Sequence, residues 1–372
     1  MNAVALTQEL VRIRTVNPLD PERPAAERAG KLLEEAGWSV KSYEFAPGRT
    51  SVVARREGSS DALPLAFAGH LDTVPLGAAP WSHDPYGGER AGDRLYGRGS
   101  SDMKSGVAAI VAAALQLSHA RLRGAGLTVV LVAGEETGCE GAAHLARTPS
   151  ALGRASALLV AEPTGNQPVI GHKGALWLRA RVRGVTAHGS MPERGVNAVV
   201  KAARAVLQLA DLKFDVAPDP LLGRPTVNIG TFAGGLNVNS VPDEAVVGID
   251  LRTIPAQRHA QVRAQLAELL GPEVDLLPIV DLEGVRTDES DPFVRAVMGA
   301  VRDVTGENPR AGSATYFTDA SVLTPAYGGV PTVVLGPGEM ALCHQTDEWC
   351  SVAKIEQAVD AYVRIARAWC QA

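Results

Sequence analysis

The sequence has few cysteines, no block of basic residues and no long hydrophobic run. Its four cysteines include no Cys-x-x-Cys pair, and a disulfide framework is not expected in a chain of 372 residues. We therefore expect reduced thiols in a cytoplasmic protein. Apolar runs are broken by Gly, Glu or Arg well short of a membrane span, and the N-terminal residues lack the pattern of a signal peptide.

The charge balance is slightly acidic, with 36 Lys and Arg against 41 Asp and Glu and a net charge of −5. Nucleic acid is therefore not expected as a partner. Hydrophobic residues make up 46% of the chain, which is a globular composition with ample material for a core. Because 372 residues exceed what one core usually serves, we expect two domains.

Short apolar runs alternate with helical patterns in the first half of the chain. Continuous runs of this kind are typical of strands buried on both faces, which indicates a largely parallel α/β sheet. The expected helices cover 4–16, 21–37 and 106–117, and the expected strands cover 65–69, 127–133, 157–161 and 331–335.

The pattern changes near Gly174, where apolar and charged residues begin to alternate. Alternation over 175–185 is typical of a half-exposed antiparallel strand. Further strands near 226–230, 245–251 and 274–277 and helices at 197–209 and 256–270 complete a small α+β insert. We therefore predict a catalytic domain formed by 1–173 and 290–372, interrupted by an inserted domain at 174–289.

Five segments place residues that commonly bind metals directly after expected strands, in loops or before an expected helix. Open α/β sheets place their active sites at the carboxyl ends of parallel strands, so these segments are expected to converge. Imidazoles and carboxylates together suit a pair of Zn²⁺-like ions with an open position for water. The segments are Gly69–Asp72, Ser101–Lys104, Gly134–Thr137, Ala161–Thr164 and Cys343–Asp347.

His70 and Asp72 form a His-x-Asp pair, in which Asp72 can accept the second ring N–H of His70 and fix its tautomer. Asp102 lies in a glycine-rich stretch ahead of a helix, where its two oxygens can each bind a different ion. Each motif also has an ordinary alternative. His70 can be an incidental residue in a surface turn, and Asp102 can cap the helix.

Glu135 and Glu136 are adjacent, so their side chains are expected to diverge after the preceding strand. One can bind a metal while the other takes a proton from a water whose pKa the metal lowers. Glu162 follows another apolar strand, and His344 lies in a loop after 331–335. Singly, Glu162 and His344 can be incidental, and the interpretation as a site depends on convergence at one sheet edge.

These segments resemble the motifs of the dinuclear zinc amidohydrolases of the M20 peptidase family, in particular the acetylornithine deacetylase and succinyl-diaminopimelate desuccinylase branch. The likeness covers nearly the whole chain. It implies a zinc-peptidase-like α/β/α catalytic domain with an inserted α+β lid that makes a homodimer interface. It also implies two Zn²⁺ per subunit, although mixed nitrogen and oxygen sites also accept Co²⁺ or Mn²⁺.

The resemblance assigns a role to each residue of the expected centre. It implies His70 and Glu162 on one ion, Glu136 and His344 on the other, and Asp102 bridging them. It further implies Glu135 as general base and acid and Asp72 as the residue that orients His70.

In the insert, the resemblance implies that His188 reaches the partner subunit's site and stabilises the oxyanion. It implies that Asn239 and Arg252 hold the carboxylate of the substrate, a bidentate task that suits Arg. The ordinary alternatives are a turn residue for His188 and a surface ion pair for Arg252. Tyr316 and Phe317 stand where small residues are common in the family, so the pocket is expected to differ there.

Together these features predict metal-dependent hydrolysis of the amide bond of a small-molecule N-acyl amino acid, in amino-acid biosynthesis. A metallo-carboxypeptidase or dipeptidase of the same family is the alternative within hydrolases. A catalytically inactive binding protein on this fold is the alternative from another class, and it is disfavoured because no expected ligand position is substituted.

Overall fold

A computed structural model describes residues 2–371, which divide into two compact units. The first unit runs from the start of the described chain to Gly171 and includes Arg286–Ser313 and the described residues from Thr318 onward. The second unit comprises His172–Val285 and Ala314–Phe317. The chain thus leaves the first unit, builds the second and returns. The functional domain ranges given above remain our proposal.

The first unit contains a mixed sheet with the strand order β1-β2-β6-β3-β7-β15-β8-β13, and β14 pairs with β8. The central strands β6, β3, β7 and β15 are parallel, whereas β1 and β2 form an antiparallel hairpin whose second strand is antiparallel to β6. The expectation of a largely parallel sheet therefore holds for the centre alone. The strands are β1 (Ser39–Ala46), β2 (Arg49–Arg56), β3 (Leu65–His70), β6 (Leu127–Val132), β7 (Ala157–Val160), β8 (Val169–His172), β13 (Val285–Arg286), β14 (Gly312–Ala314) and β15 (Thr332–Val334).

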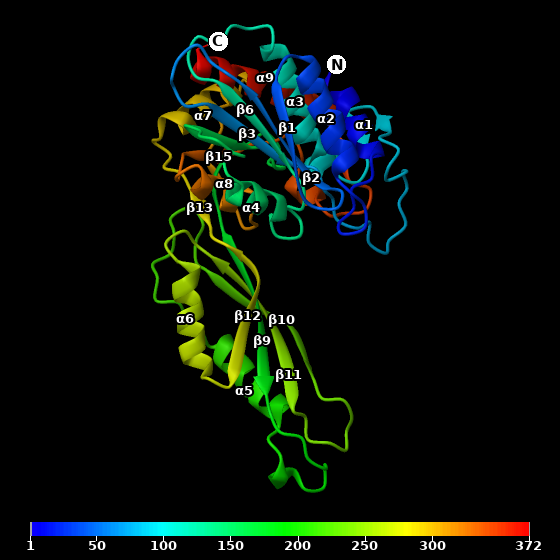
Figure 1. Cartoon of the computed structure of the whole chain (residues 1–372), viewed down its shortest axis with the longest axis vertical. Coiled ribbons are helices and arrows are strands. Elements are labelled where there is room, and N and C mark those ends of the chain that lie inside the picture. Colours follow the sequence, from blue (N-terminus) through cyan, green and yellow to red (C-terminus); the bar gives the residue numbers. More distant parts are fainter. Residues whose placement is uncertain (1, 372) are drawn as a thin grey trace. The chain divides into compact units, whose positions relative to one another are not determined.

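Helices cover both faces of this sheet, as Figure 1 shows. On one face, α3 and α9 pack against each other and both contact β3, with α1, α2 and α7 beside them; α4 and α8 pack together on the other face. Eleven of the thirteen residues of α3 are buried, because small Ala side chains let it pack closely on several sides. The helices are α1 (Ala3–Arg12), α2 (Arg23–Glu35), α3 (Ser105–Leu117), α4 (Glu140–Arg147), α7 (Pro292–Thr305), α8 (Ala320–Ala326) and α9 (Val352–Cys370).

Several shorter elements lie between the main strands and helices. A three-stranded sheet has the order β16-β5-β4, so a strand just before α9 pairs with a strand from the first hundred residues. The short elements are β4 (Arg90–Ala91), β5 (Arg94–Tyr96), β16 (Trp349–Ser351) and the helical turns η1 (Ser100–Lys104), η2 (Pro192–Arg194) and η3 (Met340–Leu342). Of these, η2 belongs to the second unit.

The second unit is an antiparallel sheet of order β10-β11-β9-β12, with two helices packed on it. Along β9, alternate residues are buried in the core between sheet and helices. The expected half-exposed antiparallel strand is therefore confirmed. The elements are β9 (Gly174–Arg183), α5 (Ala198–Ala210), β10 (Thr226–Gly234), β11 (Glu244–Thr253), α6 (His259–Leu270) and β12 (Val274–Leu282).

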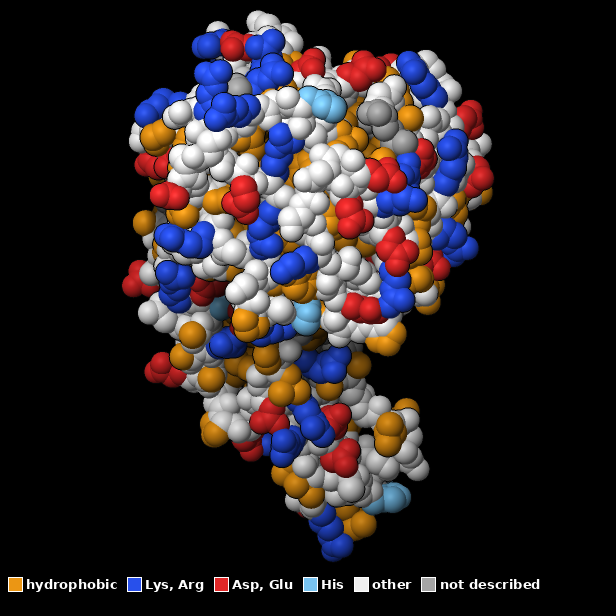
Figure 2. All heavy atoms as spheres, turned by 45° about the horizontal axis from the view of Figure 1, so that its top comes forward, with side chains coloured by type: hydrophobic (Ala, Val, Ile, Leu, Met, Phe, Trp, Pro, Cys, Tyr) orange, Lys and Arg blue, Asp and Glu red, His pale blue; other side chains and the backbone are white. Residues whose placement is uncertain are grey.

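All four cysteines are free, as expected, and among residues 2–371 the structure has no helix with the length and apolar character needed to cross a membrane. On the face shown in Figure 2, basic and acidic side chains are interspersed over most of the surface.

Candidate metal centre

Three neighbouring parallel strands end at the centre. His70 is the last residue of β3, Glu135 and Glu136 follow β6, and Glu162 follows β7. Because these strands are parallel neighbours, their carboxyl ends meet at one edge of the sheet. Asp102 comes from η1 at the start of α3.

Two groups of side chains are close enough together to hold one ion each. In the first group, His70 Nε2 lies 3.1 Å from Asp102 Oδ1 and 3.8 Å from Glu162 Oε2. In the second, His344 Nε2 lies 3.3 Å from Asp102 Oδ2 and 3.1 Å from Glu136 Oε1. Within each group the potential ligand atoms lie within 4.8 Å of one another. The sequence therefore located five side chains that the fold does bring together.

Asp102 belongs to both groups, and its two oxygens face different histidines. This arrangement is the one required of a carboxylate that bridges two ions. The alternative, in which Asp102 caps the following helix, is wrong, because Lys104 precedes α3 and no side chain caps it.

The electrostatics of the protein groups fit a cationic occupant. Burial, followed by the charge of Glu162, raises the pKa of Glu135 well above its usual value, and burial likewise raises the pKa of Glu162. Glu162 Oε1 is also buried without a hydrogen-bond partner. Crowded, desolvated carboxylates of this kind are costly unless a cation compensates them. The nitrogen and oxygen donor set fits a pair of divalent cations.

The same carboxylates raise the pKa values of the two histidines. Burial alone would lower the pKa of His70, but the charges of Glu162 and Asp102 outweigh it and raise that pKa well above 6.5. Hydrogen bonds to Asp102 and Glu136 raise the pKa of His344 to about 10. For Asp102, burial is outweighed by its contacts with His344 and His70, which hold its pKa below the usual range.

Glu135 and Glu136 diverge as expected. Glu136 faces His344, whereas Glu135 belongs to neither group of potential ligands and has Oε1 at 4.0 Å from Cys139 Sγ. Glu135 is only 5% exposed. A buried carboxyl group with a raised pKa is suited to accept and return a proton.

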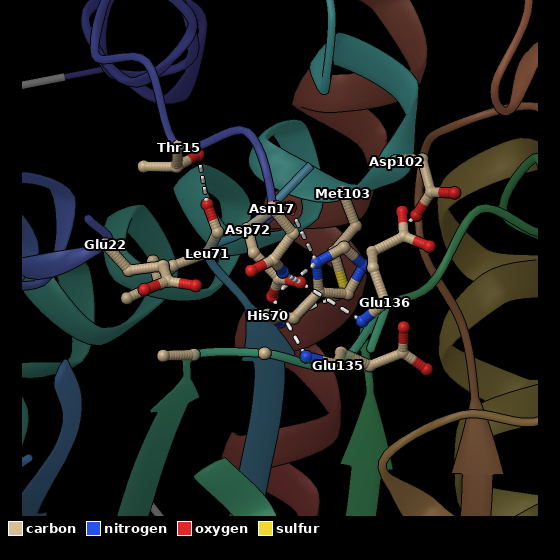
Figure 3. A network of polar contacts seen from close by, with 12 residues as sticks. Thr15, Asn17, Glu22, His70, Leu71, Asp72, Asp102, Met103, Glu135 and Glu136 are labelled. Atoms are coloured by element: carbon tan, nitrogen blue, oxygen red, sulfur yellow. Dashed lines mark hydrogen bonds and ion pairs between the residues drawn. The ribbon is translucent and has the colours of Figure 1, made fainter. Parts of the chain in front are cut away.

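Asp72 differs in detail from the expectation. The ring nitrogen Nδ1 of His70 lies 3.0 Å from the main-chain oxygen of Asp72 and 3.6 Å from its carboxylate. A carbonyl oxygen only accepts, so Nδ1 keeps its proton when the ring is neutral, and Nε2 is the nitrogen that can bind an ion. The carboxylate instead accepts from Asn17 Nδ2 and from the main-chain N–H groups of Glu135 (3.0 Å) and Glu136 (3.1 Å) (Figure 3). Asp72 therefore fixes the Glu135–Glu136 turn as well as His70.

Two buried residues beside the centre carry no signal in the sequence. Asn17 has no motif around it, and only its contact with Asp72 identifies it. Glu348 follows the His344 segment directly and is fully buried against Arg98, with Oε2 2.7 Å from Nη1. Its neighbour Asp347 accepts hydrogen bonds from the main chain and hydroxyl of Ser82.

The expected substrate residues lie in the second unit, whereas the potential ligands lie in the first. His188 is exposed, with Nδ1 2.7 Å from Ser190 Oγ. Asn239 is also exposed. The Arg252 guanidinium pairs with Asp250 at 2.9 Å, which is the ion pair of the ordinary alternative, and lies over the Trp177 ring. The substrate roles of these residues remain predictions.

Comparison with known proteins identifies the family of this chain and solved structures with the same fold. Residues 66–368 match the model of peptidase family M20/M25/M40. The chain is 32% identical to an acetylornithine deacetylase from Myxococcus xanthus over 382 residues, which cover 98% of this chain and 97% of that protein. The sequence likeness therefore spans almost the full length of both.

Two solved structures share the fold. An M20 family metallo-carboxypeptidase from Sulfolobus solfataricus has a TM-score of 0.82 at 18% identity and covers 100% of both chains. A protein from Bacillus subtilis, described as a dinuclear metal-binding peptidase of the M20 family, has a TM-score of 0.73 at 15% identity and covers 99% of this chain and 98% of its own.

Proposed function

The chain belongs to peptidase family M20/M25/M40 and is a hydrolase, and on that premise we propose that it hydrolyses the amide bond of an N-acyl amino acid at a centre of two divalent cations. The observation that carries the proposal is the position of Asp102, with one oxygen toward His70 and the other toward His344. A single carboxylate between two histidine-containing groups is what a dinuclear centre requires.

In this proposal His70 and Glu162 would hold one ion, Glu136 and His344 would hold the other, and Asp102 would contribute to both. We propose Zn²⁺, with Co²⁺ or Mn²⁺ as substitutes, because the donors are nitrogen and oxygen only. Such ions supply a water of lowered pKa and stabilise negative charge on the carbonyl oxygen of the substrate. The Bacillus subtilis protein with the same fold, described as a dinuclear metal-binding peptidase, supports the proposal of two ions.

Glu135 is the proposed general base and acid. It takes a proton from the attacking water and later delivers it to the amine nitrogen that leaves. Its pKa is raised by burial, which makes the carboxylate a stronger base toward the water and leaves the proton available for the amine. Asp72 holds Glu135 in place through the main-chain N–H of Glu135.

The second unit is proposed as a lid that binds the substrate and makes a homodimer. Arg252 and Asn239 are proposed to hold the substrate carboxylate, and His188 to stabilise the oxyanion in the partner subunit. An edge strand and exposed apolar side chains support a contact with a second copy: β10 lies at the sheet edge, and Leu236 and Val238 after it are 98% and 104% exposed.

We propose the cytoplasm as the location, because all four cysteines are free thiols. A role in amino-acid biosynthesis is proposed from the likeness to an acetylornithine deacetylase. The interspersed charges seen in Figure 2 offer no support for a nucleic-acid partner.

An N-acyl amino acid is favoured over a dipeptide because the full-length relative at 32% identity is a deacetylase, whereas the peptidase at 18% identity shows the fold alone. Metal analysis combined with a panel of N-acetyl amino acids, N-succinyl amino acids and dipeptides tests the choice. We expect about two divalent ions per subunit and turnover of the acyl compounds.

Turnover of dipeptides with none of the acyl compounds would establish the peptidase alternative. Purified protein that neither binds divalent ions nor gains activity from them would support the inactive binding protein, although the presence of every expected ligand in place speaks against it.

A further inference from the structure

Glu348 is fully buried, and each of its carboxylate oxygens accepts two hydrogen bonds. Its Oε1 accepts from the main-chain N–H groups of Ser101 at 2.8 Å and Asp102 at 3.0 Å. Its Oε2 accepts from Arg98 Nη1 at 2.7 Å and from the main-chain N–H of Gly99 at 3.0 Å. One side chain therefore holds four donors that come from five consecutive residues.

The five-residue stretch 98–102 needs such an anchor because its main chain is irregular, with only the turn η1 over its last three residues. Gly99 has φ of +82°, a conformation that the other amino acids rarely adopt, and a Cβ there would meet Thr73 Cγ2 at 2.5 Å. Asp102 and Met103 have non-helical backbone angles within η1. The direction of the Asp102 side chain therefore depends on contacts from outside the stretch.

Those contacts come from the segment that carries His344, four residues before Glu348. Glu348 precedes β16, and β16 pairs with β5, which leads directly into the 98–102 stretch. The main-chain N–H of Gly97 also donates to the Glu348 carbonyl oxygen at 2.9 Å. Side chain and main chain of Glu348 thus both bind the chain that leads to Asp102.

The guanidinium group of Arg98 balances the negative charge of Glu348. Arg98 is 1% exposed, donates to the Pro75 carbonyl oxygen at 3.2 Å and lies under the Trp81 ring, 5.2 Å from its centroid. A buried carboxylate that keeps one guanidinium and three N–H donors is held in a single geometry. A carboxylate held this rigidly can fix the position of a metal ligand better than a mobile surface carboxylate can.

We propose that Glu348 is a positioning residue that sets the distance between the Asp102 and His344 segments before any ion binds. It touches neither substrate nor ion and acts through Asp102. This inference rests on the proposed dinuclear centre. In known metalloproteins, removing a residue that orients a ligand typically weakens metal affinity or activity about 10–100-fold.

Glu348→Gln tests the proposal, because it keeps the size of the side chain but replaces one acceptor oxygen with an NH₂ group and removes the charge. We expect folded Glu348→Gln to bind its more weakly held ion about 10–100-fold less tightly, measured by titration against a chelator of known affinity. The absorption spectrum of the Co²⁺-loaded variant should also change, since it reports the ligand arrangement. The matched control is Glu356→Gln, which removes a carboxylate from an exposed position on α9.

Folded Glu348→Gln with both affinities within twofold of the wild type and an unchanged Co²⁺ spectrum would overturn the proposal. If Glu348→Gln does not fold, Glu348→Asp keeps the charge but reaches fewer of the four donors, and it should show a smaller loss of the same kind. A wild-type protein that binds no divalent ion would instead refute the proposed function itself, so the two failures are distinguishable.

A measurement on the unaltered protein completes the test. Because Glu348 holds the Ser101 and Asp102 N–H groups without help from an ion, we expect their hydrogen exchange to be slow in the metal-free wild type and to change less than tenfold on loading. Fast exchange that becomes slow only when ions are added would show that the ions order this stretch, and the proposal would fail.

Discussion

Glu136 Oε1 lies 3.1 Å from His344 Nε2, although the two residues are 208 positions apart in the sequence. The contact joins a carboxylate to an imidazole that hydrogen bonds to Asp102 and Glu136 hold protonated, with a pKa of about 10. A histidine that binds a metal must be neutral. Ion binding should therefore displace the His344 proton.

We predict that loading the metal-free protein at pH 7 releases about one proton or more per subunit, and that apparent affinity falls about tenfold for each pH unit between 9 and 6. The sign follows from the raised pKa of His344, since protons compete better as the pH falls. Calorimetry in buffers of different ionisation enthalpy measures the release. Affinity that does not change with pH would contradict this assignment of His344.

Glu135→Gln should separate catalysis from metal binding. The substitution keeps the shape of the side chain but removes the base, so we expect turnover to fall by about 10²- to 10⁴-fold. Metal content should stay unchanged, because Glu135 lies outside both groups of potential ligands. The adjacent Glu136→Gln is the matched comparison and should lose metal. Turnover by Glu135→Gln within tenfold of the wild type would remove Glu135 from the mechanism.

Asn17→Ala tests the support of Asp72. Asn17 is buried and donates to the Asp72 carboxylate, so its loss should lower the free energy of unfolding by about 1–3 kcal/mol. Asn17→Asp should destabilise more, because it places a second carboxylate against Asp72. Denaturant unfolding measures both. Equal stability of the two variants would show that the contact contributes no charge-dependent energy.

His172 gives a prediction about acid stability. Burial lowers the pKa of His172 to about 4 from 6.5, so between these values the unfolded chain binds one more proton than the folded chain. Stability is therefore full above about pH 6.5 and decreases on acidification toward pH 4, by about 3 kcal/mol from this group.

His172→Gln removes this titration, so the difference in unfolding free energy between variant and wild type should change over the same pH range. His119→Gln, at an exposed position, is the control for the loss of an imidazole. Parallel pH profiles for His172→Gln and the wild type would exclude this role of burial.

Much of the fold could be predicted because its central strands are continuous apolar runs and most of the β9 strand alternates. The hairpin of β1 and β2 was missed, since its exposed first strand carries no clear alternation. The three-stranded sheet of β4, β5 and β16 was also missed, because two- and three-residue strands have no period to detect. Pairing between such short segments is decided by tertiary contacts.

The same limit applies to the site. His70, Glu136 and Glu162 stand in short motifs directly after strands, Asp102 ahead of a helix and His344 in a loop, so their convergence could be predicted. Glu348 and Asn17 could not, because their roles come from hydrogen bonds to main-chain groups and side chains far away in the sequence. Whether the His70 ring faces the carbonyl or the carboxylate of Asp72 likewise depends on distances that a sequence does not contain.

The order of the proposed ligands along the chain has a consequence for biogenesis. A ribosome synthesises His70, Asp102 and Glu162 well before it reaches His344, and the groups that surround the second ion are incomplete until then. A nascent polypeptide can therefore present only the group of His70, Asp102 and Glu162 to a cation. If the proposed centre is correct, loading with both ions follows translation of the His344 segment, and a product truncated ahead of it should not retain two ions.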